Sequence, residues 1–408
     1  MAKRKEFDVI IWGASGFTGR LVAEYYLQQY GLDGDLKWAM AGRNLEKLES
    51  VRAAVGDSRI PLIVANSHDK ESLDAMVART KVICTTVGPY ALYGDALVES
   101  CVEQGVDYCD LAGETQWIRR MIDKHHEKAQ ETGARIVHCC GFDSIPSDLG
   151  VLFLQNQAKE QSGEYVKSVK MRLKSAKGGF SGGTYASMNN VMAEAEKDKS
   201  VYKVLFNPYG LNPQGETSGP DGPDLQSVKY DEDVNAWIMP FIMAAINTRV
   251  VRRSHALQSY PYGKDFRYDE AMITGKGISG RLKAYAGLAA LAAMTMGKAD
   301  SFYKKMVNRF FPEPGEGPSR EEREAGFWSF TVVGKYANGK RIVAKVSGDR
   351  DPGYGSTSKM LGESAACLAL DKRRTPRVRG VLTPASAMGK VLIERLQSHA
   401  GLNFSIVK

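Results

Sequence analysis

The sequence predicts an α/β protein with an N-terminal doubly wound parallel sheet and a second, α+β domain. Three observations support this prediction: an apolar run followed by a glycine-rich turn near the start, strands alternating with helices up to about residue 150, and a change of pattern from about residue 165. Parallel strands joined by helices at this interval require right-handed crossovers, which is the doubly wound arrangement of a Rossmann domain.

The first strand and helix are predicted in the stretch VIIWGASGFTGRLVAEYYL. Val9–Trp12 is apolar without alternation, as in a parallel strand that is buried on both faces, and Arg20–Gln29 can continue as a helix. Gly13, Gly16 and Gly19 lie between them at a spacing of three residues. The pattern is GxxGxxG, which differs from the GxGxxG of most dinucleotide-binding turns.

A turn of this kind gives a dinucleotide close access to the backbone. One glycine permits the tight turn, a second lets a pyrophosphate approach, and a third lets helix and strand pack closely. The helix N-terminus adds unpaired N–H groups and a partial positive charge. A plain strand–helix turn is the alternative interpretation. The cofactor-binding residues predicted in this turn are Gly13, Ser15, Gly16, Phe17, Thr18 and Gly19.

Five further strands and the helices between them complete the first region, residues 1–150, which is predicted to be a dinucleotide-binding domain. Short apolar runs mark the strands, and apolar residues at helical spacing mark the helices. The strands are predicted at Leu36–Ala41, Pro61–Ala65, Val82–Val87, Tyr108–Leu111 and Arg135–Cys140. The helices are predicted around Leu73–Val77, over Ala96–Gln104 and along a polar segment ending near Thr132.

Residues at the ends of these strands are candidates for further cofactor contacts. Arg43 follows the second strand, where an NAD-specific domain usually carries an acid, so the arginine favours the 2′-phosphate of NADP(H). A solvated surface arginine is the alternative. Asp69 follows the third strand and can contact the adenine or cap the next helix. Thr86 and Gly88 end the fourth strand, where the nicotinamide half is expected.

Tyr90, Tyr93 and Asp143 are the candidate proton donors. The tyrosines follow the fourth strand at the expected ligand crevice, and Asp143 lies in HCCGFDSIPSDLG, which ends the sixth strand and opens a helix. Packing is the alternative role for the tyrosines, and helix capping is the alternative for the neighbouring Ser147 and Asp148. The sequence does not single out one of the three candidates.

From about residue 165 the pattern changes, and residues 165–351 are predicted to form an α+β domain for substrate binding or dimerisation. A strand at Tyr165–Lys174 precedes a glycine-rich turn into a helix, and Asn207–Asp224 is predicted to be a long surface loop. Phe327–Val333 and Lys340–Ser347 are predicted to pair as strands around an Asn-Gly turn.

The last segment, residues 356–408, begins with a predicted helix at Thr357–Leu370. We expect its helices to pack back near the first domain. The second domain also offers a surface on which two copies can associate, so a homodimer is a further expectation.

The composition narrows the range of functions. Net charge +8 and a pI near 9.0 suit an anionic ligand or an acidic membrane surface. The charges are dispersed, and Lys3–Lys5 and Lys372–Arg374 are the only runs of three basic residues, so nucleic acid is not an expected partner. The six cysteines form no CxxC pair and no His-rich ligand spacing. We therefore expect no metal site, and we expect the protein to work in a reducing, cytoplasmic compartment.

Two stretches are strongly apolar: AWIMPFIMAAI (Ala236–Ile246) and AYAGLAALAAMTMG (Ala284–Gly297). Neither reaches the roughly 20 apolar residues that a membrane-spanning helix needs. One interpretation is a buried core helix. The other is the wall of an apolar substrate channel or, for Ala284–Gly297 with Arg281, Lys283 and Lys298 beside it, a peripheral membrane contact.

Several motifs occur in an order that resembles one family. GASGFTG, AGRN, VGPYALYG, YCDLAGE and GFDSIPSD follow one another as in the saccharopine dehydrogenase-like oxidoreductases, and PEPGEGPS and DPGYGSTSKMLGESA resemble its bacterial branch, the trans-acting enoyl reductases. The resemblance runs from residue 7 to about residue 390. It implies a Rossmann NADP-binding domain with Gly13, Gly16, Gly19 and Arg43 at cofactor positions, and it supplies no catalytic residue.

Together these observations predict an NADPH-dependent oxidoreductase with a small apolar substrate. The resemblance implies that the reduced bond is the C=C (enoyl) bond of a lipid or polyketide-like molecule. Two alternatives stay open. One is an amino-acid C–N dehydrogenase of the saccharopine type, in which Arg249, Arg252 and Arg253 bind carboxylates. The other is a membrane-associated NADP-binding scaffold without turnover.

Overall fold

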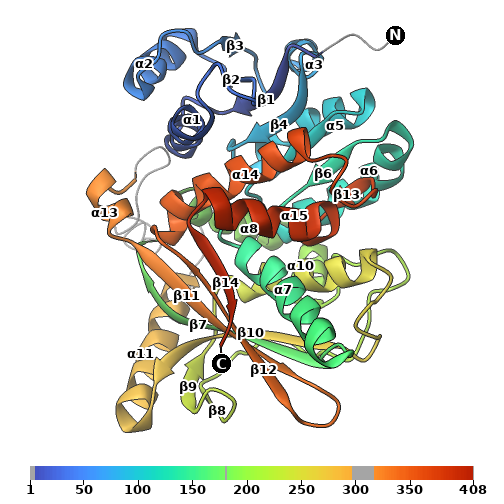
Figure 1. Cartoon of the computed structure of the whole chain (residues 1–408), viewed down its shortest axis with the longest axis vertical. Helices are drawn as coiled ribbons and strands as arrows, with labels where there is room; N and C mark the ends of the chain where they lie inside the picture. Colours follow the sequence, from blue (N-terminus) through green and yellow to red (C-terminus); the bar gives the residue numbers. More distant parts are fainter. Residues whose placement is uncertain (1–4, 180–181, 296–316, 408) are drawn as a thin grey trace.

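Two seven-stranded sheets organise the part of the chain that the structure describes (Figure 1). The structure is a computed structural model and describes residues 5–179, 182–295 and 317–407. Sheet A contains the N-terminal strands and sheet B contains those of the middle and late sequence, and each sheet also includes one strand from the C-terminal segment.

Sheet A is parallel throughout, in the order β13-β6-β5-β4-β1-β2-β3. Its strands are β1 (Phe7–Trp12), β2 (Trp38–Gly42), β3 (Leu62–Val64), β4 (Thr80–Thr85), β5 (Asp107–Cys109), β6 (Arg135–Val137) and β13 (Gly380–Leu382). The first six have the Rossmann order, so the predicted doubly wound parallel sheet is confirmed. The seventh, β13, extends the sheet beyond β6 and was not anticipated.

Helices cover sheet A on both faces. α1 (Phe17–Tyr30) packs with α14 (Thr357–Leu370), and α14 also contacts β1, β4 and β5 at the centre of the sheet. Right-handed crossovers on the other side of β1 bring helices to the opposite face. The remaining helices here are α2 (Leu45–Val55), α3 (Lys70–Val77), α4 (Tyr90–Tyr93), α5 (Asp95–Gln104) and α6 (Thr115–Thr132).

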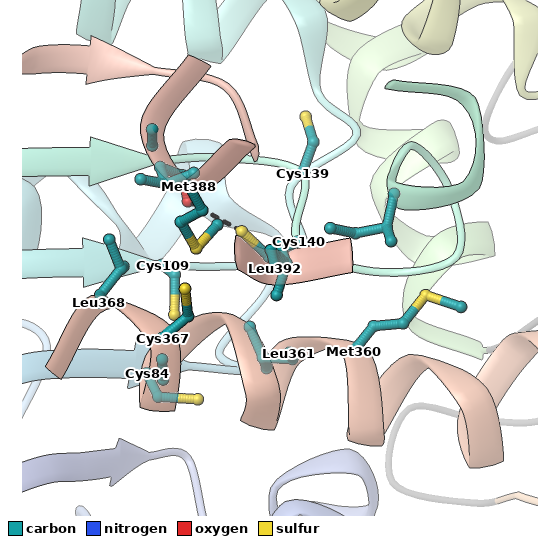
Figure 2. Packing of buried hydrophobic residues seen from close by; sticks show 14 of the residues in the cluster. Cys84, Cys109, Cys139, Cys140, Met360, Leu361, Cys367, Leu368, Met388 and Leu392 are labelled. Atoms are coloured by element: carbon teal, nitrogen blue, oxygen red, sulfur yellow. Dashed lines mark hydrogen bonds between the residues drawn. The ribbon is translucent and has the colours of Figure 1, made fainter. Parts of the chain in front are cut away.

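The contact between α14 and sheet A is rich in sulfur (Figure 2). Cys84 on β4, Cys109 on β5 and Cys367 on α14 gather there, and Cys140 lies nearby. All six cysteines are free and buried. Burial raises the pKa of the Cys367 thiol to about 12, and that of Cys109 rises well above its ordinary value for the same reason. These thiols therefore pack as small apolar side chains.

Sheet B is mixed, in the order β14-β12-β11-β7-β10-β9-β8, with β7 and β10 parallel and the other neighbours antiparallel. Its strands are β7 (Ser168–Lys177), β8 (Lys229–Asp231), β9 (Ala236–Met239), β10 (Arg267–Gly275), β11 (Phe327–Lys335), β12 (Arg341–Gly348) and β14 (Leu402–Ile406). The pairing of β11 with β12 confirms the predicted strand pair. The mixed sheet also fits the predicted α+β character of this part.

Three helices, α7 (Ile145–Ser162), α10 (Ala244–Leu257) and α11 (Gly277–Thr295), pack on sheet B. The other helices of the described chain are α8 (Gly182–Lys197), α9 (Ser200–Phe206), α13 (Arg320–Glu324), the π-helix η1 (Pro352–Ser356) and α15 (Pro384–His399). α15 packs on α14 and α7, so it connects the helices that cover the two sheets (Figure 1).

The apolar run Ala236–Ile246 is not a buried helix, so that interpretation is wrong. Its first part is the strand β9, and α10 begins only at Ala244. Pro240 lies between them, where its missing N–H group and fixed φ angle suit a break between two elements.

The second run, Ala284–Gly297, lies on α11 up to Thr295, and its last two residues are outside the described ranges. A buried core helix is the wrong description here as well. Ala284 is buried against sheet B, whereas the opposite side of α11 is open to solvent. Within the described ranges, no helix combines the length and apolar character needed to cross a bilayer.

A buried polar network holds α7 against α10 and β10. Asn247 on α10 accepts a hydrogen bond from Ser144 Oγ (2.9 Å) and donates to Ser147 Oγ (3.2 Å) and Glu270 Oε2 (3.0 Å). Tyr268 donates to the other oxygen of Glu270 (2.5 Å). Burial raises the pKa of the Glu270 carboxyl to about 7. This network fixes the first turn of α7, which follows β6 at the carboxyl edge of sheet A.

Replacing Glu270 by glutamine should change how stability depends on pH. An unfolded glutamate titrates near ~4.3, whereas Glu270 titrates at about 7 in the fold, so between these values the folded state keeps a proton that the unfolded state has lost. The wild-type free energy of unfolding should therefore carry a contribution that falls as pH rises through this window, and Glu270→Gln should remove it. Urea unfolding at about pH 5 and about pH 8 measures the difference.

The control is Glu232→Gln, because Glu232 is exposed and its carboxylate is in water in both states. That variant should keep the wild-type pH dependence. If Glu270→Gln also keeps it, the carboxyl of Glu270 does not hold a proton in the folded protein.

Candidate functional site

The turn after β1 admits only glycine at two positions. Gly13 has a φ of +87°, in the left-handed region, and an added Cβ would lie 2.6 Å from Val87 Cγ2. A Cβ on Gly19 would lie 2.2 Å from the carbonyl oxygen of Gly13, so α1 packs directly on the end of β1. The same carbonyl accepts hydrogen bonds from the Gly16 N–H (2.9 Å) and the Thr86 hydroxyl (3.3 Å).

Gly16 leaves the backbone open at the N-terminus of α1. A Cβ added there would approach only the Gly13 carbonyl, at 3.3 Å, and the residue is exposed. The first turn of α1 carries no acidic residue, and no hydrogen bond within the described chain occupies the N–H of Phe17 or Thr18. Unpaired N–H groups at a helix N-terminus attract anions. The turn therefore fits a pyrophosphate.

The end of β2 presents a cation beside this turn. Arg43 follows Gly42 and is exposed, and its guanidinium has no ion pair or hydrogen bond with the described residues. Ser15 lies next to the same strand end, since its Oγ would be 3.3 Å from a Cβ on Gly42. Arg43 is thus available to an anionic group, as a 2′-phosphate requires.

Asp69 and Gly88 lie at the ends of the neighbouring strands. Asp69 caps α3, where Oδ1 accepts the N–H groups of Glu71 (3.1 Å) and Ser72 (3.4 Å). These hydrogen bonds are those expected if Asp69 caps the following helix, the alternative to a contact with the adenine. Gly88 is exposed after β4, and an added Cβ would lie 3.5 Å from the ring of Tyr90 and 3.9 Å from Ser187 Oγ on α8.

Tyr90 is a buried packing residue in its observed contacts. Its hydroxyl donates to the carbonyl of Thr85 (3.3 Å) and accepts from the N–H of Leu111 (3.1 Å). Its ring stacks on Trp117 with centroids 5.5 Å apart. Burial raises the pKa of Tyr90 well above its ordinary value. The structure thus gives this phenol no free position from which to donate a proton.

Tyr93 and Asp143 are the half-exposed members of the candidate set. Tyr93 contacts His68 edge-to-face, with centroids 5.8 Å apart. Asp143 lies between β6 and α7, its Oδ2 would be 3.9 Å from a Cβ on Gly113, and no described residue donates a hydrogen bond to it. Burial raises the pKa of the Asp143 carboxyl to about 6. A partly buried carboxyl of this kind can exchange a proton near neutral pH.

Glu114 organises the loop after β4, and the sequence analysis missed it. Oε1 accepts the N–H of Tyr90 (2.7 Å) and the hydroxyl of Ser187 (2.9 Å), and Oε2 accepts the N–H of Ala91 (3.0 Å). This buried carboxylate thus connects α4 with α8. The available signal was its position as the last residue of the motif YCDLAGE.

Asp110 has a similar role between β5 and β6 and was also missed. It is fully buried, and Oδ2 is 2.7 Å from His138 Nδ1 and accepts the Tyr108 hydroxyl (2.9 Å). Oδ1 accepts the N–H groups of Ala112 (2.9 Å) and Cys139 (3.1 Å). Asp110 therefore fixes the two loops that carry Glu114 and Asp143.

The three arginines of α10 do not form a site for carboxylate substrates. Arg249 and Arg252 pair with carboxylates of the chain's own 207–224 segment, and Arg253 donates to the carbonyl of Leu211 (2.6 Å). All three arginines are buried, and so is Leu211. The prediction of a surface loop is therefore wrong for part of this segment, because its irregular backbone provides partners for buried cations.

A groove of about 760 Å³ lies elsewhere, between α1, α13 and α14. Of the predicted cofactor residues it contains Phe17 alone, so it meets the glycine turn only there. Its charged lining is mainly basic, with Arg20, Arg320, Arg323, Arg350 and Lys359 beside Glu24 and Glu324.

Comparisons with known proteins bear on this site. Residues 9–137 match the family model described as the saccharopine dehydrogenase NADP binding domain, a range that includes the glycine turn and Arg43. Among solved structures, the apo saccharopine dehydrogenase (L-Glu forming) of Saccharomyces cerevisiae has a TM-score of 0.54 at 12% identity, covering 98% of this chain and 100% of that chain. At this identity the likeness shows a shared fold.

Relatives found by sequence align with nearly the whole chain. A Mycobacterium tuberculosis protein assigned by name to the trans-acting enoyl reductases is 42% identical, over 100% of this chain and 99% of that protein. The trans-acting enoyl reductase of Mycobacterium ulcerans is 38% identical over 96% of each. The resemblance found in the motifs is confirmed: the chain belongs to the trans-acting enoyl reductase family and carries the saccharopine dehydrogenase NADP-binding domain at residues 9–137.

Proposed function

We propose that this chain is an NADPH-dependent oxidoreductase that reduces the C=C (enoyl) bond of an apolar, lipid or polyketide-like substrate. The glycine turn carries the proposal, because Gly16 leaves room for a pyrophosphate beside the N-terminus of α1. The names of the relatives support the type of bond, and the matching family model supports the cofactor.

The residues that would hold NADPH lie at the carboxyl ends of β1 to β4. The turn binds the pyrophosphate, and Arg43 binds the 2′-phosphate. When bound, the nicotinamide supplies the hydride. The proposed set is Gly13, Ser15, Gly16, Phe17, Thr18, Gly19, Arg43, Asp69, Thr86 and Gly88, with Asp69 contributing only the carboxyl oxygen that does not cap α3.

Asp143 is our candidate for the proton donor. Reduction of an enoyl bond adds a hydride to one carbon and a proton to the other, so an acid must lie beside the substrate. Asp143 is half-buried and titrates near neutral pH, whereas the phenol of Tyr90 is occupied by two backbone partners. Tyr93 is the remaining alternative, since its ring is also half-exposed.

Apolar side chains beside Asp143 support an apolar substrate. Phe142 and Leu111 are both partly exposed, and Phe142 packs on Trp328 of sheet B with ring centroids 5.1 Å apart. Water is thus displaced from part of the surroundings of the carboxyl, which suits a hydrocarbon chain better than an amino acid. The amino-acid alternative also lacks its arginines, because all three are paired internally.

A cytoplasmic site of action is part of the proposal. All six cysteines are reduced thiols in the core, as expected for a compartment that keeps thiols reduced. Contact with a membrane surface is compatible with this location.

Arg43→Ala should weaken NADPH binding selectively. Loss of a charge-assisted bond to a phosphate costs about 1.5–3 kcal/mol, so the dissociation constant for NADPH should rise by at least about tenfold. NADH lacks the 2′-phosphate, and its affinity should not change. Fluorescence or calorimetric titration of both dinucleotides measures this.

The matched control is Lys47→Ala, which removes an exposed cation of α2 close to Arg43 in sequence. It should leave both affinities unchanged. Equal losses for NADPH and NADH in Arg43→Ala would refute the role of Arg43. Absence of binding to either dinucleotide in the wild type would favour the scaffold without turnover.

Asp143→Asn should lower the rate of enone reduction by about a hundredfold or more, the usual contribution of a general acid. A general acid must be protonated, so the wild-type rate should fall as pH rises through about 6, and the variant should lose this step. Steady-state NADPH consumption against pH, with an apolar enone as acceptor, tests both statements.

NADPH affinity serves as the internal control and should be unchanged in Asp143→Asn. Tyr93→Phe distinguishes the other candidate. A rate loss of similar size in Tyr93→Phe, with Asp143→Asn near the wild-type rate, would transfer the role to the tyrosine.

A further inference from the structure

We propose that the exposed side of α11 binds the surface of an anionic lipid bilayer. This function goes beyond the proposed reductase activity and requires neither cofactor nor substrate. α11 lies at the end of the molecule remote from α1 and α2 (Figure 1), so a flat surface can reach it.

The first observation is a stripe of large apolar side chains on the solvent side of α11. Ile278, Leu282 and Tyr285 are 80%, 65% and 50% exposed, and Ala289 continues the line. Their spacing of four, three and four residues places all of them on one face of a helix. Isolated exposed apolar residues are ordinary, whereas an aligned set indicates an interaction surface.

The other side of the same helix is already in use. A Cβ on Gly287 would lie 2.4 Å from Met239 Sδ on β9, so α11 packs closely on sheet B through its small residues. Ala284 is buried on that side. The exposed stripe is therefore a second apolar face of α11, distinct from the face that packs on sheet B.

Charge identifies the occupant as an anionic surface. Lys276, Arg281 and Lys283 are exposed around the stripe, and α11 contains no Asp or Glu. On the neighbouring β8–β9 turn, Asp231 and Asp233 are paired with cations of sheet B, which leaves Glu232 as its exposed carboxylate. Basic residues flanking an apolar helix face are the pattern of helices that lie on anionic bilayers.

Aromatic side chains beside the stripe fit the same occupant. The Arg281 guanidinium lies 5.2 Å from the centroid of the Trp237 ring and 5.9 Å from that of Tyr285. Tyr230 packs edge-on against Trp237, with centroids 5.6 Å apart. Tryptophan and tyrosine favour the boundary between headgroups and hydrocarbon, because one end of each ring system is apolar and the other is polar.

The test is cosedimentation of the whole protein with vesicles of phosphatidylcholine containing phosphatidylglycerol, against vesicles of phosphatidylcholine alone. The wild type should bind the anionic vesicles preferentially. Ile278→Glu combined with Leu282→Glu should reduce binding by at least about tenfold, since two apolar contacts become anions. Lys276→Gln and Lys283→Gln should each reduce it by about fivefold, and added salt should have the same effect.

Phe206→Glu on α9 is the matched control, because Phe206 is 70% exposed and lies outside the stripe. It should bind vesicles like the wild type. Circular dichroism and thermal unfolding check that the variants fold, which their exposed positions favour. Vesicle binding is measured without NADPH, so this proposal and the proposed reductase function can fail independently of each other.

Three outcomes would overturn the proposal. One is a wild type that does not bind anionic vesicles. Another is binding that survives in the Ile278→Glu and Leu282→Glu double variant. The third is a homodimer in analytical ultracentrifugation that this double variant dissociates, without vesicle binding, which would assign the face to a second copy of the chain.

Discussion

The carbonyl group of Gly13 determines the geometry of the nucleotide-binding half. It accepts the N–H of Gly16 and the hydroxyl of Thr86, and it lies so close to Gly19 that no side chain fits there. Through this one group the end of β1, the first turn of α1 and the residues after β4 have fixed relative positions. A side chain at position 19 would separate the helix from the strand and move the N-terminal N–H groups away from the strand edge.

A second layer of buried carboxylates positions the loops around this turn. Asp110 holds the loops after β5 and β6, and Glu114 holds the loop after β4 together with α8. Each carboxylate oxygen of these two residues has hydrogen-bond partners. Asp143 differs, because no described residue donates a hydrogen bond to its carboxyl. That contrast between satisfied and unsatisfied acids at one sheet edge is the chemical basis for assigning it a role in proton transfer.

Sheet A could be predicted because its signals are local. Each strand is an apolar run bounded by turn residues, and the cofactor candidates follow the strand ends directly, so chain order alone places them. Glu114 and Asp110 could not be found in this way. Their structural role depends on hydrogen bonds with partners such as Ser187 and His138, which belong to other elements. A single sequence does not show which distant side chains come into contact.

Other elements of the fold were harder to predict from the sequence for similar reasons. β8 and β13 are strands of three residues, too short for a periodic pattern, and each pairs along a neighbouring strand. β14 does alternate, with Leu402, Phe404 and Ile406 apolar, and this signal was missed. The two apolar runs gave the wrong element or the wrong burial. Pro240 divides the first run, and the second lies on a helix that buries Ala284 but leaves Tyr285 50% exposed. The hydrophobicity of a segment does not by itself show which face of the helix or strand packs on the core and which face is exposed to solvent.

The order of the elements along the chain has a consequence for biosynthesis. β13 completes the edge of sheet A, α14 covers its centre and β14 completes sheet B, and each follows in the chain the strands that it joins or covers. During translation, the Rossmann strands leave the ribosome with the sulfur-lined face beneath α14 still uncovered (Figure 2). The nascent chain must therefore hold an incomplete Rossmann domain, with an apolar face exposed to solvent, until α14 and β13 have been made.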